Sequence, residues 1–141
     1  MILVDTNIIS EVMKLTPDAR VVRWVERIDG NDLFTTAVSE GEIWSGLMTM
    51  SAGRRRQTLV ATATDIFDNA FRGQIISFDR FAAREYGDVM ARRRAAGRPI
   101  QTADAMIAAI AISHGFAVAT RNVRDFADTG VTVLNPFDGT P

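Results

Sequence analysis

Short apolar segments alternate with longer helical segments along the whole chain, and this alternation is the feature that most constrains the fold. The apolar segments predict strands at residues 2–4, 33–35, 74–77, 116–119 and 131–134. Between them, apolar residues at helical spacing predict helices at residues 7–14, 17–29, 37–50, 54–71, 79–96 and 102–114. This order of elements predicts an α/β fold with a mainly parallel sheet that helices cover on both faces.

The composition fits a single domain that spans residues 1–141. With 141 residues, 47% of them hydrophobic, the chain can bury a substantial core without disulfides or structural metals. It contains no cysteine, which excludes thiolate catalysis and zinc–thiolate sites and suits a reducing cytoplasm. The longest aliphatic run, residues 105–112, is too short to cross a bilayer, and the N-terminus shows no signal-peptide pattern. We therefore expect a cytoplasmic protein with no membrane partner.

The net charge of −1 gives no whole-chain signal for nucleic-acid binding, but the basic residues are unusual in kind. All 16 basic residues except Lys14 are arginine, and runs of three stand at Arg54–Arg56 and Arg92–Arg94. Arginine presents a planar fork that matches phosphate or carboxylate groups. Composition bias and solvated helix faces explain the same pattern, so a basic patch beside an acidic cleft and a plain solvated surface both stay open.

Two acidic residues stand at element boundaries where parallel α/β folds place their sites. Asp5 directly follows the first strand, and ligands bind at the carboxyl ends of parallel strands. Asp5 equally suits the N-cap of the following helix. Asp104 falls in the first turn of the helix that Thr102 is predicted to cap, where an acid complements the helix dipole. That helix is apolar nearly all round and is predicted to be buried, so its carboxylate needs a partner such as a cation.

Two further acids have alternative interpretations that the residues alone do not separate. On the helix predicted after the second strand, the apolar stripe includes Trp44 and Met48, which puts Glu42 on the other side and Glu40 nearer the stripe. Glu42 then lines either a cleft or a solvent-exposed face. Asp125, in the stretch TRNVRDF after the fourth strand, is either a site acid or part of a turn or short helix.

Together these positions bring three or four carboxylates to one edge of one sheet. Carboxylates that gather without a counter-charge repel one another, and some would stay protonated. A divalent cation relieves this repulsion, and a ligand set made only of oxygen atoms favours Mg²⁺ or Mn²⁺. The pattern therefore predicts a metal site that activates water and orients a phosphodiester.

Four segments of the chain match the motifs of a known family in order and spacing. They are MILVDTNIIS at residues 1–10, TAVSEGEIWSG at 36–46, TADAMIAAIA at 102–111 and VATRNVRDF at 118–126. The chain resembles the PIN-domain ribonucleases in these segments, and more closely the VapC toxins of bacterial toxin–antitoxin pairs. The opening DTNIISE and the late VLNPF favour the FitB-like branch. The resemblance covers essentially the whole chain.

The resemblance implies an α/β/α sandwich with a mostly parallel five-stranded sheet, and a Mg²⁺- or Mn²⁺-dependent endoribonuclease. By position, Asp5, Glu42 and Asp104 match the family's metal-binding acids, which selects Glu42 over Glu40. Asp125 is then a weaker fourth ligand, because many members carry an aspartate at the position of Asn122. The positions that line the site in the family, where they would orient carboxylates, water or RNA, are Thr6, Asn7, Ser39, Thr120, Arg121 and Asn122.

The resemblance also implies partners. It implies a cognate VapB- or FitA-like antitoxin that blocks the acidic cleft and carries the DNA-binding domain, so operator DNA is reached only through the antitoxin. It further implies a homodimer, and an RNA substrate cut to leave a 5′-phosphate and a 3′-hydroxyl. Trp24 and Trp44 are either interface anchors or ordinary core residues. The alternative function is a PIN-like module that binds RNA or protein without cutting.

Overall fold

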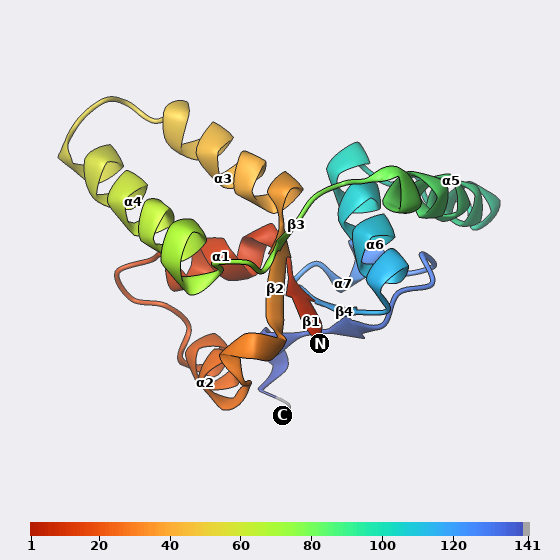
Figure 1. Ribbon diagram of the computed structural model, residues 1–141, viewed down its shortest axis with the longest axis horizontal. Helices are drawn as coiled ribbons and strands as arrows, with labels where there is room; N and C mark the ends of the chain where they lie inside the picture. The colour runs from red at the N-terminus through yellow and green to blue at the C-terminus, as the bar shows by residue number, and fades with distance from the viewer. Residues whose placement is uncertain (140–141) are drawn as a thin grey trace.

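The computed structural model describes residues 1–139 and shows a five-stranded sheet with helices on both faces (Figure 1). The strands are β1 (Ile2–Val4), β2 (Leu33–Thr36), β3 (Ile75–Ile76), β4 (Ala117–Ala119) and β5 (Val133–Leu134). They lie in the order β3-β2-β1-β4-β5, and each neighbouring pair is parallel. The predicted α/β sandwich is therefore confirmed, and its sheet is wholly parallel within the described residues.

Seven α-helices connect or follow the strands of the described chain. They are α1 (Thr6–Val12), α2 (Ala19–Arg27), α3 (Ala37–Met48), α4 (Arg54–Asp65), α5 (Arg80–Ala95), α6 (Thr102–His114) and α7 (Val123–Phe126). Short 3-10 turns stand at Gly30–Asp32 and Pro136–Asp138. The predicted helix at residues 54–71 is divided, because α4 passes into a π-helical turn at Ile66–Ala70. No helix of residues 1–139 has the length and apolar character needed to span a membrane.

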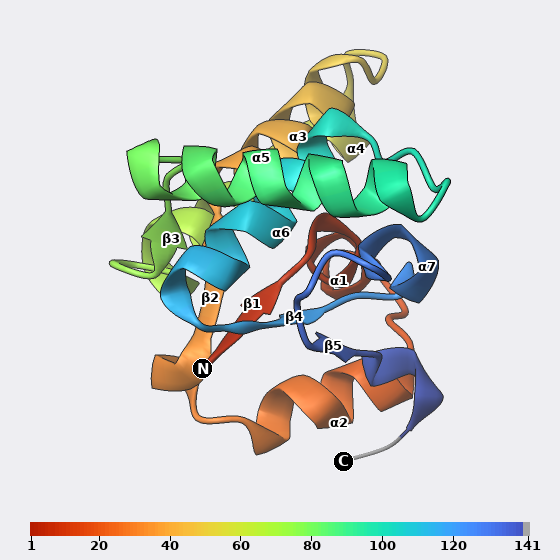
Figure 2. The same cartoon turned by 90° about the vertical axis from the view of Figure 1, so that its right-hand side faces the viewer.

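Neighbouring residues of β1 serve two separate cores, one on each face of the sheet. Val4 packs into a cluster with Ile8 and Ile9 of α1 and with residues of α2, α3 and α4. Leu3 points the other way, into a cluster built from α5, α6 and α7. Figure 1 shows the two groups of helices on either side of the sheet, and Figure 2 shows α5 lying across α6. The alternation of side chains along a strand thus joins both layers to the central strand.

Helix α6 is the most deeply buried helix of the second layer. Six of the seven residues from Ala105 to Ala111 are fully buried, all except Met106, which agrees with the apolar sequence of the helix. The sequence predicts Thr102 as its N-cap, and this is wrong. Thr102 is the first helical residue, because the carbonyl of Gln101 already accepts the N–H of Ala105 at 3.0 Å. Asp104 stays in the first turn, so the buried helix delivers this acid to the carboxyl edge of the sheet.

Replacing Ile110 with alanine tests the packing of this layer. Ile110 is fully buried, so Ile110→Ala should lower the free energy of unfolding by about 2–5 kcal/mol through lost burial and a cavity. Urea denaturation of the purified variants measures this change. Leu15→Ala is the control, because Leu15 is completely exposed and its loss should change stability by less than about 0.5 kcal/mol. Equal losses in the two variants would contradict the assigned core.

Candidate active site

A hydrogen-bond network centred on Asp5 lies at the carboxyl end of β1. Asp5 is 3% exposed, and its N–H donates to the Ala119 carbonyl at 2.9 Å, which extends the pairing of β1 with β4. One carboxylate oxygen, Oδ1, accepts the N–H of Thr6 at 2.7 Å. The other, Oδ2, accepts Thr120 Oγ1 at 2.8 Å and Asn7 Nδ2 at 3.0 Å. Asp5 therefore caps α1 and is also fixed in place by side chains from two elements.

A second layer of hydrogen bonds ties the start of α1 to the segment after β4. Asn7 Oδ1 accepts the N–H of Arg121 at 3.0 Å. Thr120 Oγ1 accepts Asn7 Nδ2 and the N–H of Asn122, each at 3.0 Å. The predicted lining residues of these two segments are thus brought together, and each orients a neighbour or Asp5 itself.

Glu42 reaches this edge from α3. Its Oε1 accepts the hydroxyl of Thr6 at 2.7 Å, while the rest of the residue is exposed to solvent. Glu40 is engaged elsewhere, because its Oε2 accepts Trp44 Nε1 at 2.9 Å. The structure therefore places Glu42, and not Glu40, beside the Asp5 network, a distinction that helical periodicity leaves open.

Ser39 differs from the other predicted lining residues because, in the described chain, it stabilises the start of α3 and does not hydrogen-bond the acids at the sheet edge. It is fully buried, its N–H donates to Thr36 Oγ1 at 2.9 Å, and the Thr36 hydroxyl lies 3.2 Å from Ser39 Oγ. These contacts cap α3. Ser39 thus fixes the start of the helix that carries Glu42 and hydrogen-bonds to none of the four acids within the described residues.

Asp104 and Asp125 form, with Asp5 and Glu42, a group of four acids whose charges interact. Burial, followed by the carboxylates of Asp5, Asp125 and Glu42, raises the pKa of Asp104 to about 6. Burial also raises the pKa of Asp5, against the hydrogen bonds that its carboxylate accepts, and Glu42 and Asp125 add to the rise. Four residues far apart in sequence therefore form one electrostatic cluster, as expected for carboxylates that gather without a close cation.

The donor set of this cluster fits a hard divalent cation in its chemistry. Its donors are all oxygen atoms, which Mg²⁺ and Mn²⁺ prefer. No three acidic, histidine or cysteine side chains of residues 1–139 are arranged to hold a single ion. Mg²⁺ commonly binds one or two carboxylates directly and keeps several waters. The arrangement therefore fits an ion held directly by some of the four acids and through water by the others.

Arg121 stands at the rim of the cluster and is held from two sides. Its guanidinium lies over the ring of Phe137, 3.8 Å from the centroid, and its Nη2 is 3.9 Å from Glu11 Oε2. Its side chain is nevertheless 53% exposed. Stacking and the nearby carboxylate orient this cation without removing it from solvent, so it stays available to an anionic ligand.

A family model described as the PIN domain matches residues 2–131 of the chain. The chain belongs to the PIN-domain family. It is 38% identical to the VapC ribonuclease Y4jK of Sinorhizobium fredii over 98% of this chain and 99% of that protein. It is 33% identical to Toxin FitB of Neisseria gonorrhoeae over 97% and 99% of the two chains. A solved structure of FitAB bound to a DNA fragment superposes with a TM-score of 0.91 at 33% identity, covering 97% and 96%. The resemblance noted in the sequence is thereby confirmed.

Glu11 is a buried acid of this PIN domain that is not among the site residues predicted from the sequence. It is 5% exposed and accepts hydrogen bonds from Lys14 Nζ at 2.7 Å and from the N–H of Asp18 at 2.9 Å. The hydrogen bond from Lys14, followed by that from Asp18, lowers its pKa. Glu11 thus joins the end of α1 to the start of α2 and lies beside Arg121. Its place one helical turn after buried Ile8 is the sequence signal that could have revealed its burial.

The raised pKa of Asp104 predicts how its charge affects stability in the metal-free protein. A folded-state pKa of about 6 lies above the ordinary aspartate value of 3.8, so the native state binds an extra proton between these pH values. The stabilisation from Asp104 is full below the lower value and is lost as pH rises through about 6. Asp104→Asn should therefore become progressively more stable relative to the parent protein as pH rises through this window.

Urea denaturation in a chelator, from about pH 4 to pH 7, measures this difference. Asp32→Asn is the control, because Asp32 is an exposed acid that immediately precedes β2 and so lies at the end of the strand away from the acidic cluster. A difference between Asp104→Asn and the parent protein that does not change with pH would contradict the shifted pKa.

Proposed function

We propose that this PIN domain is a metal-dependent endoribonuclease that acts as the toxin of a toxin–antitoxin pair. The observation that carries the proposal is the acidic cluster at the carboxyl edge of the sheet. The carboxylates of Glu42 and Asp125 add to the burial that raises the pKa of Asp5 and Asp104 there, and Asp5 is held by donors from two elements. The names of the relatives, a VapC ribonuclease and a toxin, support the same assignment.

Mg²⁺, with Mn²⁺ as a substitute, is the cofactor that the donor set suits best. Asp5, Asp104 and Glu42 would hold it, with Asp125 as a weaker ligand through water. When bound, the ion lowers the pKa of a water molecule and neutralises charge that develops on the phosphodiester. No histidine is needed for this chemistry, and His114 stands at the far end of α6 from Asp104.

The chain's own side chains orient these acids and the substrate. Thr120 and Asn7 fix one oxygen of Asp5, and Thr6 directs Glu42 toward the same edge. The Asp5 carboxylate is thereby held in one orientation, so it would need little rearrangement to bind an ion. Arg121 at the rim would contact the RNA backbone. A single strand or loop is the expected substrate, because a folded RNA helix exposes little base edge to a protein.

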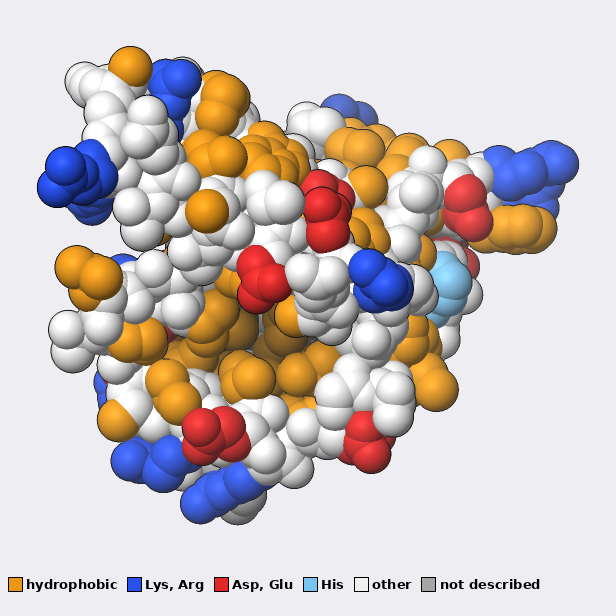
Figure 3. Space-filling view, turned by 60° about the vertical axis from the view of Figure 1, so that its left-hand side comes forward, with side chains coloured by type: hydrophobic (Ala, Val, Ile, Leu, Met, Phe, Trp, Pro, Cys, Tyr) orange, Lys and Arg blue, Asp and Glu red, His pale blue; other side chains and the backbone are white. Residues whose placement is uncertain are grey.

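The partners proposed for the chain are a VapB- or FitA-like antitoxin and a second copy of itself. Solved structures similar to this chain include FitAB on DNA and FitAcB of Neisseria gonorrhoeae. Operator DNA would be bound through the antitoxin, and the complex would act in the cytoplasm. Figure 3 shows a hollow lined by hydrophobic side chains, with charged side chains around it, on the face where α2 and α4 lie. Such a surface suits an antitoxin segment with apolar and charged residues.

Of the two tryptophans considered as interface anchors, Trp44 is the more exposed. Trp24 is 7% exposed and packs in the core of the α1–α4 layer, so it is not an interface anchor. Trp44 is only partly buried and keeps its indole N–H on Glu40.

The alternative function is a PIN-like module that binds RNA or protein without cutting. No three candidate ligands of the described residues close around one point. Calorimetry with Mn²⁺ separates the two functions. Binding of Mn²⁺ supports the nuclease, and its absence supports the binding module.

Removing the charge of either central aspartate tests the nuclease directly. Asp5→Asn and Asp104→Asn should each lower Mg²⁺-dependent RNA cleavage by more than about 100-fold, because each removes a metal ligand. Cleavage of a fluorescent RNA oligonucleotide by the purified chain measures this loss. Glu40→Gln is the matched control on α3 and should leave cleavage unchanged, because Glu40 bonds Trp44 instead of the cluster. Full activity in both aspartate variants would refute the mechanism.

Replacing Arg121 tests the proposed contact with the RNA backbone. Arg121→Gln should weaken binding of single-stranded RNA and reduce the slope of log affinity against log salt by about 0.7, as expected for one lost phosphate contact. Fluorescence anisotropy in a chelator measures binding without cleavage. Arg27→Gln is the control, because Arg27 ends α2, at the opposite end of the sheet from the acids. An unchanged slope for Arg121→Gln would mean that this arginine does not contact phosphate.

A further inference from the structure

Arg93 is a buried arginine in a run whose other members are exposed. It stands near the end of α5 and is 5% exposed, whereas Arg92 and Arg94 on either side are open to solvent. The sequence is compatible with either a solvated surface or a basic patch at this run, and neither interpretation holds for Arg93. A buried guanidinium needs partners for its five N–H groups, so its contacts show what it is for.

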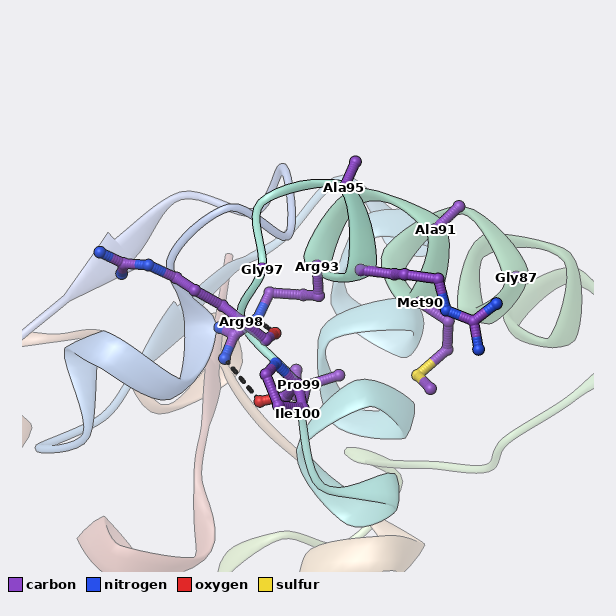
Figure 4. A pocket seen from close by; sticks show the side chains of 10 residues that line it. Gly87, Met90, Ala91, Arg93, Ala95, Gly97, Arg98, Pro99 and Ile100 are labelled. Carbon is purple, nitrogen blue, oxygen red and sulfur yellow. Dashed lines mark hydrogen bonds between the residues drawn. The ribbon is translucent and has the colours of Figure 1, made fainter.

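All the hydrogen bonds of Arg93 go to backbone carbonyls of two segments. On one side, Nε donates to the Arg98 carbonyl at 2.7 Å and Nη2 donates to that of Pro99 at 3.2 Å, in the loop before α6. Figure 4 shows the Arg93 side chain beside this loop, with a hydrogen bond drawn between them. Arg93 and residues 97–100 also line a recess of about 780 Å³. These bonds fix the loop that leads into the first turn of α6, where Asp104 lies.

On the other side, the same guanidinium holds the end of α7. Nη1 lies 3.1 Å from the Arg124 carbonyl, 2.9 Å from that of Asp125 and 2.8 Å from that of Ala127. The last carbonyls of a helix have no partner within the helix and carry partial negative charge, so a cation there is favourable. The Arg93 side chain thus bonds both the loop before α6 and the end of α7, the segments that bring Asp104 and Asp125 to the sheet edge.

Arg93 also keeps its positive charge free of any carboxylate partner. No Asp or Glu of residues 1–139 lies within ion-pair distance of its guanidinium. Its charge still acts on the cluster, because it opposes the rise in the pKa of Asp104. Arg93 therefore lies between the two segments that carry Asp104 and Asp125 and acts on both, through hydrogen bonds and through its charge.

We propose that Arg93 is a positioning residue of the acidic site, which holds the α7 segment and the loop before α6 together so that Asp125 and Asp104 converge. This inference rests on the proposed metal-dependent function for its consequence in metal binding. The local ordering by Arg93 stands on the hydrogen bonds alone and is measurable in the metal-free protein.

The experiment compares Arg93→Gln with Arg94→Gln in the full chain. Both substitutions remove one charge from the same part of α5, but Arg94 is exposed. In the metal-free protein, hydrogen exchange should become faster in residues 98–101 and 122–129 of Arg93→Gln and stay unchanged in α2. Calorimetry with Mn²⁺ should show an affinity about 10–100-fold lower in Arg93→Gln and unchanged in Arg94→Gln. Arg93→Lys keeps the charge but not the fork, so it should fall between the two.

Two comparisons separate positioning from general stability and from the proposed function. Val21→Ala lowers stability from the α2 layer, away from the acids, and should keep the parent affinity for Mn²⁺. If Arg93→Gln is too unstable to purify, Arg93→Lys carries the same test. A parent protein that fails to bind Mn²⁺ overturns the metal-dependent function, while exchange in the two segments still decides the role of Arg93. Unchanged exchange there, or equal Mn²⁺ affinity in Arg93→Gln and Arg94→Gln, overturns the positioning role.

Discussion

The repulsion among four carboxylates at one sheet edge is the constraint on which the rest of this site depends. Burial and mutual repulsion raise the pKa of Asp104 to about 6, and both also raise that of Asp5. The fold offsets this cost with hydrogen bonds to Asp5, and a hydrogen bond to a charged group contributes about 1.5–3 kcal/mol. The donors come from α1 and from the end of β4, so the acid is stabilised by the same contacts that join these elements.

The parallel sheet explains how acids at such distant positions in the chain meet. Parallel strands present their carboxyl ends at one edge, and the central position of β1 puts Asp5 in the middle of that edge. Because β4 pairs directly with β1, the residues that follow β4 lie against the start of α1. The strands themselves are only two to four residues long, yet both faces of the sheet are covered. The helices therefore contribute most of the packing, and the pairing of the strands fixes which residues meet at the carboxyl edge.

The sequence predicts those parts of the structure that depend on local pattern. The order of strands and helices, the position of Asp5 after β1 and the first-turn position of Asp104 follow from hydrophobic periodicity, and all three are found. Periodicity fails for α3, because Met48, predicted on the apolar stripe, is 52% exposed, while Ile43 is buried. The stripe of a short helix between two layers is set by its neighbours, which a single-helix projection does not contain.

The burial of charged side chains is harder to predict from the sequence than the order of the elements. Arg93 looks like an ordinary surface residue in a charged helix, and several of the carbonyls that allow its burial are distant in the chain. Glu11 depends on the N–H of Asp18 and on Lys14, and Arg93 depends on carbonyls more than thirty residues away as well as on those nearby. A tertiary partner of this kind has no sequence signature, since any residue can offer a carbonyl.

Arg93 and Arg121 show how one residue type serves the acidic edge in two ways. Arg93 is buried, bonds only carbonyls and acts on the cluster from behind, whereas Arg121 is exposed and held by stacking on Phe137. Neither guanidinium forms an ion pair with Asp5, Glu42, Asp104 or Asp125 in the described structure. The repulsion is therefore moderated but not cancelled by the protein itself. A cation that binds this edge removes the remaining repulsion, so occupancy of the site and stability of the fold are thermodynamically linked. The same linkage means that a positively charged side chain inserted by a partner would compete with such a cation for the edge.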